Sequence, residues 1–443
     1  MKNILVVGAG RSASSLIQYL LLQSESRKWK VTVADVSLTL AEQKTKKHPA
    51  SRSIVLDIHD AVQRQTEIAA ADLVISMLPA SMHIEVAQDC VRLAKHLVTA
   101  SYVSKEIAGL DEAARKAGIV LLNEAGLDPG IDHMSAMKVI DRVHASGGEF
   151  IAFRSYCGGL VAPEYNTNPW GYKFSWNPRN VILAGQGTAQ YIENGVYRYI
   201  PYNRLFLQTE KLDIGGYGSF EAYANRDSLS YRHPYGLENI PTMLRGTLRM
   251  PGYCNAWNIF VKLGLTDDSY RINDSEKLTY GELIESFLPA GKGTTRERLI
   301  LFMDKEMTPE SISKLDWLDL FSKRKIGLSN ATPAMILQQL LEEKWKLEEG
   351  DKDMIVMQHQ FEYRASGSQA IRRITSSLVV KGEDQIYTAM AKTVGLPVAI
   401  AAGLILDGKI TTPGVQIPTR KEIYEPVLTE LEQLGIRFEE TER

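Results

Sequence analysis

The N-terminal segment constrains the fold of this chain more than any other, because an apolar run leads directly into a glycine-rich turn. Residues 4–7 are Ile, Leu, Val and Val, and Gly8, Gly10 and Ala13 follow with the spacing G-x-G-x-x-A. An unbroken apolar strand is typical of a parallel sheet that is covered on both faces. Small residues at this spacing let a strand, a turn and a helix approach a pyrophosphate closely. Because an amphipathic stretch over residues 14–22 follows at once, we predict a strand–turn–helix unit that binds a dinucleotide.

The same alternation of strand and helix continues to about residue 123. Short apolar runs recur at regular intervals, and each is followed by a polar stretch with helical character. The expected strands lie at residues 30–34, 53–56, 73–77, 96–100 and 119–122. This pattern is typical of α/β proteins. We therefore predict a Rossmann-type, doubly wound parallel sheet that forms a dinucleotide-binding domain over residues 1–123.

The chain from residue 124 to residue 390 differs from the first domain in composition and in the pattern of its apolar residues. Residues 150–260 are rich in Tyr, Trp, Gly and Asn and contain alternating segments, which favour a mixed or antiparallel sheet. Residues 265–350 become helical and charged, with Thr332 and Pro333 as the N-cap and first turn of a helix. The sheet is expected to resume in two strand-like runs, at residues 354–363 and 371–380. We predict a second, α+β domain over residues 124–390, with a helical insertion at about 265–350.

The composition argues against several classes of partner. The chain has 51 Lys and Arg against 53 Asp and Glu, a formal net charge of −2, so neither nucleic acid nor a membrane surface is expected as a partner. The most apolar later stretch, residues 394–406, is shorter than the about 20 residues that a membrane span needs. Cys90, Cys157 and Cys254 show no short paired spacing typical of a metal site or a redox pair. We expect a reducing, cytoplasmic location and no bound metal.

Candidate cofactor residues extend beyond the glycine turn. Asp35 ends the second strand, near the spacing expected for a carboxylate that hydrogen-bonds the adenosine ribose. Because this carboxylate would repel the 2′-phosphate of NADP, and no Arg or Lys occupies residues 36–40, NAD is favoured over NADP. The lysines within residues 44–47 are assigned to the solvated face of a helix. Asp57 either hydrogen-bonds the adenine amine or caps the helix that follows His59. The candidate cofactor residues are Gly8, Gly10, Arg11, Ser12, Ala13, Asp35, Asp57, Ile58, Ser76, Met77 and Leu78.

The densest polar, turn-forming stretch of the chain follows the last expected strand of the first domain. Residues 123–134 read N-E-A-G-L-D-P-G-I-D-H-M. This stretch resembles the hallmark of the glutamate-forming saccharopine dehydrogenase family, G-L-D-P-G-I-D-H-M. Further motifs similar to that family occur in the same order at residues 99–104, 155–164, 172–176, 225–228 and 244–249. The resemblance is close over about residues 1–265 and looser beyond them.

The resemblance implies an enzyme that oxidises the secondary amine joining the lysine and glutamate skeletons of saccharopine. Water then splits the resulting imine into 2-aminoadipate 6-semialdehyde and glutamate, or the reverse reductive amination takes place; both belong to lysine metabolism. The resemblance also implies that the C-terminal segment, residues 391–443, packs back on the first domain. Members of this family commonly dimerise through the sheet domain, so we expect a homodimer.

The substrate implied by the resemblance carries three carboxylates. Arginine binds a carboxylate with two parallel hydrogen bonds, so Arg226, Arg245 and Arg249 are candidate carboxylate clamps. The resemblance also places Trp176 near the cofactor. The candidate substrate residues are Ser101, Tyr102, Asp128, Arg226, Arg245, Thr247, Leu248 and Arg249.

Proton transfer accompanies both amine oxidation and imine hydrolysis. Asp128, Tyr102 and Cys157 are therefore candidate catalytic residues that accept a proton, relay it or orient a water. His133 starts a helix after Asp-Pro-Gly and is expected to be structural. His83 is expected near the rim of the cofactor site.

Two other functions remain compatible with the dinucleotide-binding turn. A carboxynorspermidine-type polyamine dehydrogenase of the same family would share the cofactor half but lack part of the arginine set. A non-catalytic NAD-binding regulator would have no reason to keep Ser101, Tyr102, Asp128 and the arginines together. The combination of Arg226 with Arg245 and Arg249 favours the saccharopine enzyme.

Overall fold

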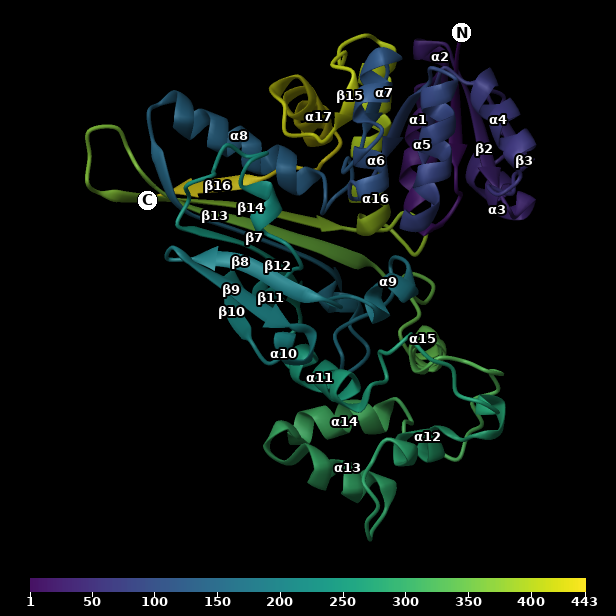
Figure 1. Cartoon of the computed structure of the whole chain (residues 1–443), viewed down its shortest axis with the longest axis vertical. Helices are drawn as coiled ribbons and strands as arrows, with labels where there is room; N and C mark the ends of the chain where they lie inside the picture. The colour runs from purple at the N-terminus through teal and green to yellow at the C-terminus, as the bar shows by residue number, and fades with distance from the viewer. The chain divides into compact units, whose positions relative to one another are not determined.

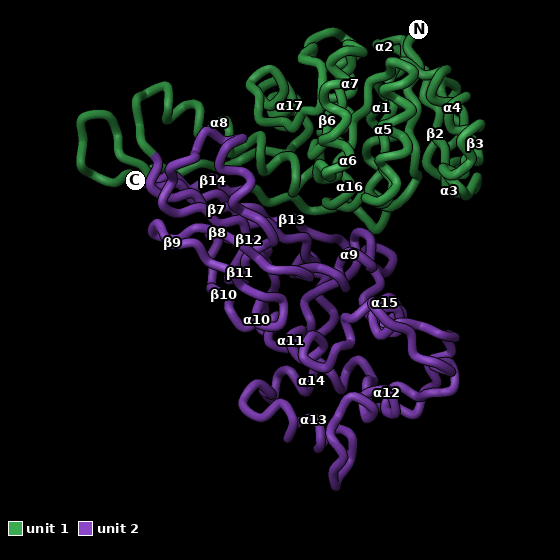
Figure 2. The backbone as a smooth tube through the Cα atoms, viewed as in Figure 1, with its two compact units in different colours: residues 1–149, 363–372, 378–443 green, residues 150–362, 373–377 purple.

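The computed structural model describes all 443 residues, and it divides into two compact units (Figure 2). Unit 1 comprises residues 1–149, 363–372 and 378–443, and unit 2 comprises residues 150–362 and 373–377. The chain therefore leaves unit 1 after residue 149, builds most of unit 2, and completes unit 1 after residue 362, apart from a short return to unit 2 at residues 373–377.

Unit 1 contains a seven-stranded sheet in the order β15-β6-β5-β4-β1-β2-β3, and its strand pairs are parallel. Apart from the added edge strand β15, this is the strand order of the Rossmann fold, as predicted. The strands are β1 (Lys2–Val7), β2 (Trp29–Asp35), β3 (Ser51–Val55), β4 (Leu73–Ser76), β5 (His96–Thr99), β6 (Val120–Leu122) and β15 (Gly414–Gln416).

Helices cover both faces of this sheet (Figure 1), which explains the unbroken apolar runs in its strands. One face, with Leu5, Val7 and Val74, packs against α4, α5, α6 and α7. On the other face, α1 contacts β2, and α16 contacts β4 and β5. The helices of the sheet region are α1 (Ser14–Leu22), α2 (Ser24–Arg27), α3 (Leu38–Thr45), α4 (Ala61–Ala70), α5 (His83–Arg92), α6 (Lys105–Ala108), α7 (Asp111–Lys116) and α8 (Ile131–Ala145).

The C-terminal part of unit 1 consists of α16 (Ala389–Leu406), β15, α17 (Lys421–Gln433) and β16 (Glu439–Glu442). β15 continues the sheet beside β6, with Val415 opposite Leu121. α17 packs on α8, and the Tyr424 hydroxyl donates a hydrogen bond to the Asp141 carboxylate. Because α8 is held in this way, unit 1 ends at residue 149 rather than at residue 123, where the sequence pattern changes.

α16 is long and apolar enough to cross a membrane by length and composition alone, but 83% of it is buried within the protein. Two glycines let it pack closely in the core of unit 1. A Cβ at Gly395 would lie 3.0 Å from the backbone nitrogen of Leu16, and a Cβ at Gly403 would lie 3.1 Å from the ring of Trp29. These contacts identify α16 as a core helix of unit 1.

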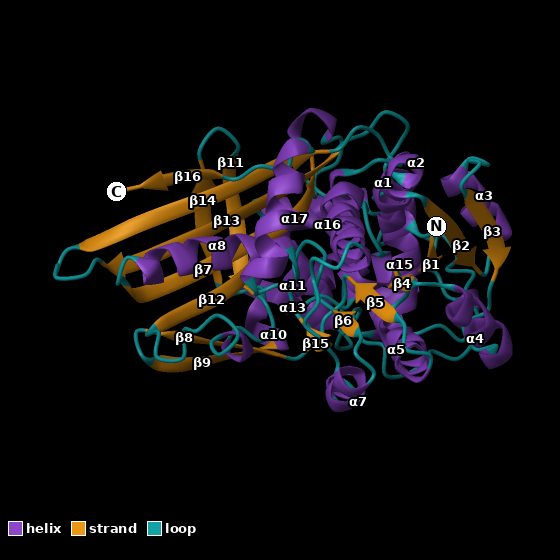
Figure 3. Ribbon diagram, turned by 90° about the horizontal axis from the view of Figure 1, so that it is seen from above, coloured by secondary structure: helices purple, strands orange, loops and turns teal.

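Unit 2 contains a mixed sheet with the order β10-β11-β12-β7-β13. Figure 3 shows its strands β12, β7 and β13 side by side. β7 and β12 are parallel, whereas β12, β11 and β10 are antiparallel neighbours. β8 pairs with β12 and with β9. The strands are β7 (Glu149–Val161), β8 (Thr188–Glu193), β9 (Val196–Pro201), β10 (Thr209–Ile214), β11 (Gly218–Ala224), β12 (Thr242–Arg249) and β13 (Asp353–Arg364). β14 (Ile371–Lys381) follows β13 in the chain and is divided between the two units.

The helices of unit 2 share a core rich in aromatic side chains. Trp170 stacks on Phe260 with ring centroids 5.5 Å apart, and Tyr253 stacks on Trp257 at the same distance. The Thr332 hydroxyl accepts a hydrogen bond from the backbone N–H of Met335, which confirms the predicted N-cap. The helices are α9 (Pro178–Ile182), α10 (Tyr202–Leu205), α11 (Tyr253–Leu263), α12 (Tyr280–Ser286), α13 (Thr295–Met303), α14 (Pro309–Trp317) and α15 (Pro333–Lys344).

Candidate functional site

The glycine turn after β1 has the geometry that a pyrophosphate needs. Gly8 has φ +101°, and a Cβ there would lie 2.9 Å from the carbonyl oxygen of Met77. Gly10 has no atom within 4 Å of its Cβ position, so its backbone is open to a ligand. A 3-10 turn over Arg11–Ala13 precedes α1, and neither element has a side-chain N-cap. Exposed N–H groups at such a helix start favour an anion.

Asp35 lies beside this turn and hydrogen-bonds its backbone. Its carboxylate accepts one hydrogen bond from the N–H of Ala9 at 2.7 Å and another from the N–H of Ser37 at 2.9 Å. Both carboxylate oxygens therefore hold the glycine turn and the start of α3 in place. The structure gives Asp35 a role in shaping the turn that the sequence spacing did not predict.

Lys44 departs from the solvated helix face predicted for it. Its side chain is half-buried, and its ammonium donates a hydrogen bond to the Ser14 hydroxyl, which in turn donates to the carbonyl of Arg11 at 3.2 Å. Burial lowers the pKa of Lys44, and the charge of the exposed Lys46 lowers it further. The long lysine stem reaches back from α3 to the start of α1, so a positive charge lies next to the glycine turn.

Asp57 does not cap the helix after His59. The carboxylate of Asp60 accepts hydrogen bonds from the first turn of α4 and is the N-cap. Asp57 is exposed and accepts a hydrogen bond from the N–H of His59 at 3.0 Å, while its neighbour Ile58 is buried in the core. The helix-cap alternative for Asp57 was therefore wrong, and its carboxylate lies in an exposed turn after β3.

Two candidate residues of unit 1, Ser76 and Ser101, are joined through His83, the first residue of α5. The His83 ring is buried, with Nδ1 2.8 Å from the Ser76 hydroxyl and Nε2 2.7 Å from the Ser101 hydroxyl. Beside Ser101, the Tyr102 hydroxyl donates to the Asp128 carboxylate at 3.3 Å. Residues after β4, β5 and β6 thus meet at the carboxyl edge of the sheet, where open α/β sheets bind their ligands.

The burial of His83 predicts a pH dependence of stability. Burial lowers the pKa of His83 to about 4, whereas an unfolded histidine has a pKa of about 6.5. Between these values the unfolded chain binds a proton that the folded chain does not, so the free energy of unfolding falls as the pH decreases from about 6.5 to about 4. His83→Gln should reduce this slope by up to about 1.4 kcal/mol per pH unit in denaturant unfolding at pH 7, 6 and 5. His59→Gln, at an exposed histidine, is the control; equal slopes in wild type and His83→Gln would contradict the prediction.

The motif at residues 123–134 forms a tight turn held by buried polar contacts. A Cβ at Gly130, which has φ +147°, would lie 2.0 Å from the carbonyl oxygen of Gly126. His133 is completely buried, and its Nε2 lies 2.9 Å from the Glu124 carboxylate. That carboxylate also accepts a hydrogen bond from the N–H of Val103 at 3.0 Å. His133 therefore has the position of a structural residue that ties the turn to the segment after β5.

In unit 2, Arg249 lies at the end of β12 in a cage of tyrosines. Its guanidinium carbon is 5.3–5.6 Å from the ring centres of Tyr172, Tyr223 and Tyr253. Arg249 is 4% exposed, its Nε has no hydrogen-bond partner, and no carboxylate pairs with it. Burial raises the pKa of each tyrosine, against the effect of the Arg249 charge, so the tyrosines stay neutral. A buried cation without a counter-charge is unfavourable, which indicates a site prepared for an anion.

The same face of the sheet carries two further candidates in one row. Thr247 of β12 lies opposite Cys157 of β7 and Tyr223 of β11. Because side chains alternate along a strand, Arg249 shares the face of Thr247. Leu248 is buried on the opposite face, so its side chain points away from this row.

The remaining candidates of unit 2 lie around this face. The guanidinium of Arg245 lies 4.4 Å from the ring centre of Tyr231. Arg226 is exposed after β11, and no carboxylate pairs with it. The indole N–H of Trp176 donates to the Tyr172 hydroxyl at 3.0 Å, which connects Trp176 to the tyrosine cage.

The tyrosine cage was not predicted from the sequence, because its tyrosines come from three separate segments. The high tyrosine content of residues 150–260 was the only sequence signal for it.

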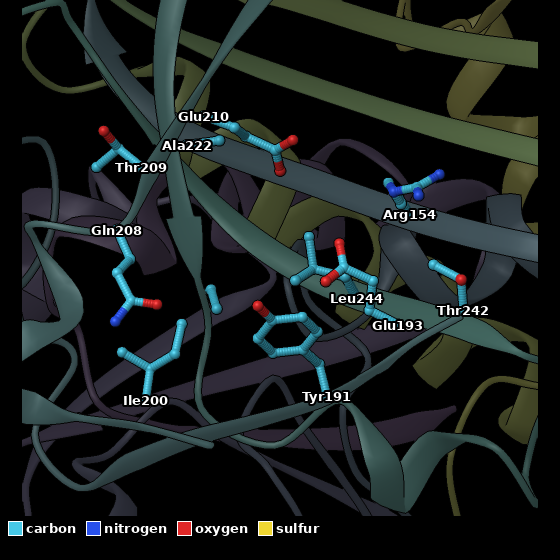
Figure 4. Close-up of a pocket in the computed structure, with 11 residues that line it drawn as sticks. Arg154, Tyr191, Glu193, Ile200, Gln208, Thr209, Glu210, Ala222, Thr242 and Leu244 are labelled. Atoms are coloured by element: carbon cyan, nitrogen blue, oxygen red, sulfur yellow. The ribbon is translucent and has the colours of Figure 1, made fainter. Parts of the chain in front are cut away.

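A separate pocket of about 230 Å³ lies on the other face of this sheet (Figure 4). Its lining includes Thr242 and Leu244, which alternate with the arginines along β12, and Arg154. It also includes the carboxylates of Glu193 and Glu210, which would repel an anionic substrate. This pocket is therefore distinct from the sheet face that carries Arg249 and its three tyrosines.

Each unit thus supplies one half of what a nicotinamide-dependent dehydrogenase requires: a dinucleotide-binding turn at a Rossmann sheet in unit 1, and a sheet face with the buried Arg249 guanidinium in unit 2. The family model described as "Saccharopine dehydrogenase NADP binding domain" matches residues 4–122, and "Saccharopine dehydrogenase C-terminal domain" matches residues 126–436. The chain belongs to the saccharopine dehydrogenase family.

Individual relatives agree with this assignment over the whole chain. Saccharopine dehydrogenase (NADP(+), L-glutamate-forming) of Schizosaccharomyces pombe is 36% identical over 99% of both chains, and that of Saccharomyces cerevisiae is 37% identical over 99% of both chains. The mitochondrial alpha-aminoadipic semialdehyde synthase of Rattus norvegicus is 35% identical over 99% of this chain and 47% of its own length. The solved structure of apo saccharopine dehydrogenase (L-Glu forming) from Saccharomyces cerevisiae superposes with a TM-score of 0.89, covering 100% of both chains at 36% identity.

Proposed function

We propose that this chain is a glutamate-forming saccharopine dehydrogenase. It oxidises the secondary amine of saccharopine to an imine that water splits into 2-aminoadipate 6-semialdehyde and glutamate, or it catalyses the reverse reductive amination. The observation that carries this proposal is Arg249, a buried guanidinium that has three neutral tyrosines around it and no carboxylate partner. A substrate carboxylate supplies the missing counter-charge, with the two parallel hydrogen bonds that a guanidinium favours.

The chain's other residues have roles that suit this substrate. Arg226 is a second cation without a carboxylate partner, and Thr247 offers a hydroxyl on the face of Arg249. When bound, a nicotinamide supplies hydride transfer, and the protein supplies binding and orientation. Asp128 accepts a hydrogen bond from Tyr102, so this pair is the best placed in unit 1 to accept or relay a proton from the amine.

We propose NADP as the cofactor, in place of the NAD that Asp35 favours in the sequence. The relatives from Schizosaccharomyces pombe and Saccharomyces cerevisiae are named as NADP(+) enzymes, and the family model over residues 4–122 is described as an NADP binding domain. Locally, the Asp35 carboxylate already accepts two backbone hydrogen bonds, and Lys44 and Arg11 bring positive charge to the start of α1. Positive charge near the glycine turn supports the proposal, because the 2′-phosphate of NADP is an anion.

Lys44→Met is expected to raise the Kd for NADP about tenfold or more and to leave the Kd for NAD within twofold. The reason is that a hydrogen bond to a charged group contributes about 1.5–3 kcal/mol, and only NADP carries the 2′-phosphate. Isothermal titration with both nucleotides measures the two constants. Lys46→Met, at an exposed lysine just after the same helix, is the matched control. An equal weakening of both nucleotides by Lys44→Met would assign Lys44 to the pyrophosphate or to the fold instead.

Wild-type protein is expected to reduce NADP in the presence of saccharopine, with a lower rate for NAD at equal concentration. The initial change in absorbance at the reduced-nicotinamide band measures both rates. A polyamine substrate of the carboxynorspermidine type should give no turnover, because it lacks the second amino-acid carboxylate for the arginines. Cofactor binding without turnover of saccharopine would contradict the proposal and favour the polyamine dehydrogenase or the regulator.

We also propose a homodimer and a cytoplasmic location. The homodimer is proposed from the family resemblance, and light scattering of the purified protein tests it. A monomeric mass at micromolar concentration would contradict it. Fractionation of the source cells tests the location.

A further inference from the structure

A buried hydrogen-bonded chain runs from Ser76 through His83 to Ser101. Ser76 is the last residue of β4 and is completely buried. Its hydroxyl has one hydrogen-bond neighbour, His83 Nδ1 at 2.8 Å. On the other side of the ring, His83 Nε2 lies 2.7 Å from the half-buried Ser101 hydroxyl. The Thr99 hydroxyl is the other neighbour of Nε2, at 3.5 Å, which is too long to compete with Ser101.

The donor and acceptor groups of Ser76, His83 and Ser101 determine the direction of each hydrogen bond between them. A buried hydroxyl needs an acceptor for its proton, and Nδ1 is the acceptor that the structure offers Ser76. A neutral imidazole has one donor and one acceptor nitrogen. If Nδ1 accepts from Ser76, then Nε2 carries the ring proton and donates it to Ser101. Ser101 therefore accepts a hydrogen bond from His83, and its own hydroxyl proton is available to an acceptor on a bound ligand.

We propose that His83 is a positioning residue that orients the Ser101 hydroxyl to donate to a substrate carboxylate. The inference rests on the proposed function, because it gives Ser101 a partner of that substrate's chemistry. With the opposite tautomer, Ser101 would donate to Nε2 and would present lone pairs to the carboxylate, which repel it. The hydrogen bond from Ser76 thus fixes the Nε2–H tautomer of His83, and this tautomer makes the Ser101 hydroxyl an acceptor toward His83 and a donor toward the substrate. No proton moves along this chain during the reaction.

The consequence for kinetics is a defect in substrate binding. His83→Leu removes both ring nitrogens, so the KM for saccharopine should rise about tenfold or more while kcat changes less than threefold, as expected when a contact equally strong in the ground state and the transition state is lost. His83→Gln offers an amide oxygen to Ser76 and an amide N–H to Ser101, and it should restore KM to within about threefold of wild type. The Kd for NADP should stay within twofold in both variants.

A double-mutant cycle separates this role from a merely structural one. Ser101→Ala should raise KM by a similar factor, and adding His83→Leu to Ser101→Ala should change KM less than twofold, because the group that His83 orients is gone. A full additional loss in the double variant would overturn the proposal. Failure of His83→Gln to recover activity while it folds like wild type would also overturn it.

The tautomer can be measured without substrate. A long-range proton–nitrogen correlation spectrum of protein labelled with 15N-histidine, assigned by the signals lost in His83→Gln, should show the neutral Nε2–H form at pH 7. The Nδ1–H form would overturn the proposal. If saccharopine is not turned over but the Nε2–H form is observed, the proposed function fails while the hydrogen-bond direction stands, so the two failures are distinguishable.

Discussion

Arg249→Met is expected to lower kcat/KM for saccharopine by about 100-fold or more without lowering the thermal stability of the free protein. The loss of activity follows because removing one partner of a buried, hydrogen-bonded charge pair costs about 2–5 kcal/mol of binding. In the free protein that partner is absent: Arg249 is 4% exposed and its Nε has no hydrogen-bond partner. Burying a cation this way is unfavourable, so an apolar side chain of similar length should be tolerated or stabilising.

Steady-state rates and calorimetry on the same preparations test this prediction. Arg249→Lys keeps the charge but loses the planar fork, and it should recover only part of the activity. Arg296→Met is the matched control, because Arg296 forms an exposed ion pair with Asp316 on α14; its kcat/KM should stay within twofold of wild type. If Arg249→Met instead unfolds at a much lower temperature than wild type, the guanidinium supports the fold and the carboxylate site lies elsewhere.

Gly130→Ala is expected to destabilise unit 1 by about 3 kcal/mol or more. The backbone there has φ +147°, which an alanine rarely adopts, and the new Cβ would lie 2.0 Å from the carbonyl oxygen of Gly126. Strain of this kind costs about 1–3 kcal/mol, and overpacking adds a similar amount. Because the affected turn also positions Asp128, activity should fall along with stability.

Gly118→Ala provides the matched control for the clash. Gly118 has φ +67° but no atom within 4 Å of its Cβ position, so this variant carries the backbone strain alone, about 1–2 kcal/mol. Calorimetric unfolding of both variants separates the two contributions. Equal destabilisation by the two alanines would show that the turn at Gly126 moves aside and that the close approach is not required.

The features that could be predicted from sequence are those with local causes. The strand before Gly8, the helix after Ala13 and the N-cap at Thr332 each depend on neighbours in the chain, and each is confirmed in the structure. The alternation of strands and helices likewise predicted the parallel sheet, because each βαβ unit is a local arrangement.

Features that depend on distant segments could not be predicted in this way. Lys44 was assigned to a solvated face because its neighbours are lysines, but its stem reaches Ser14 on another helix. Asp35 has the spacing of a ribose-binding carboxylate, yet whether it also holds the N–H of Ala9 depends on the path of the turn. The tyrosines around Arg249 lie on a loop, a strand and a helix, so only the folded chain brings them together.

The pairing of β15 with β6 has a consequence for the order of events on the ribosome. Residues 414–416 complete a sheet whose first six strands are all translated before residue 123. Until the last segment emerges, β6 is a bare edge, and the helices α16 and α17 are missing from unit 1. All residues of unit 2 are synthesised before the final segment of unit 1, residues 378–443. Unit 2 is therefore available to fold before unit 1 is complete, although unit 1 contains the first residues of the chain. A nascent chain that stalls after residue 380 would expose an incomplete nucleotide-binding unit, and it is expected to aggregate more readily than the full-length chain.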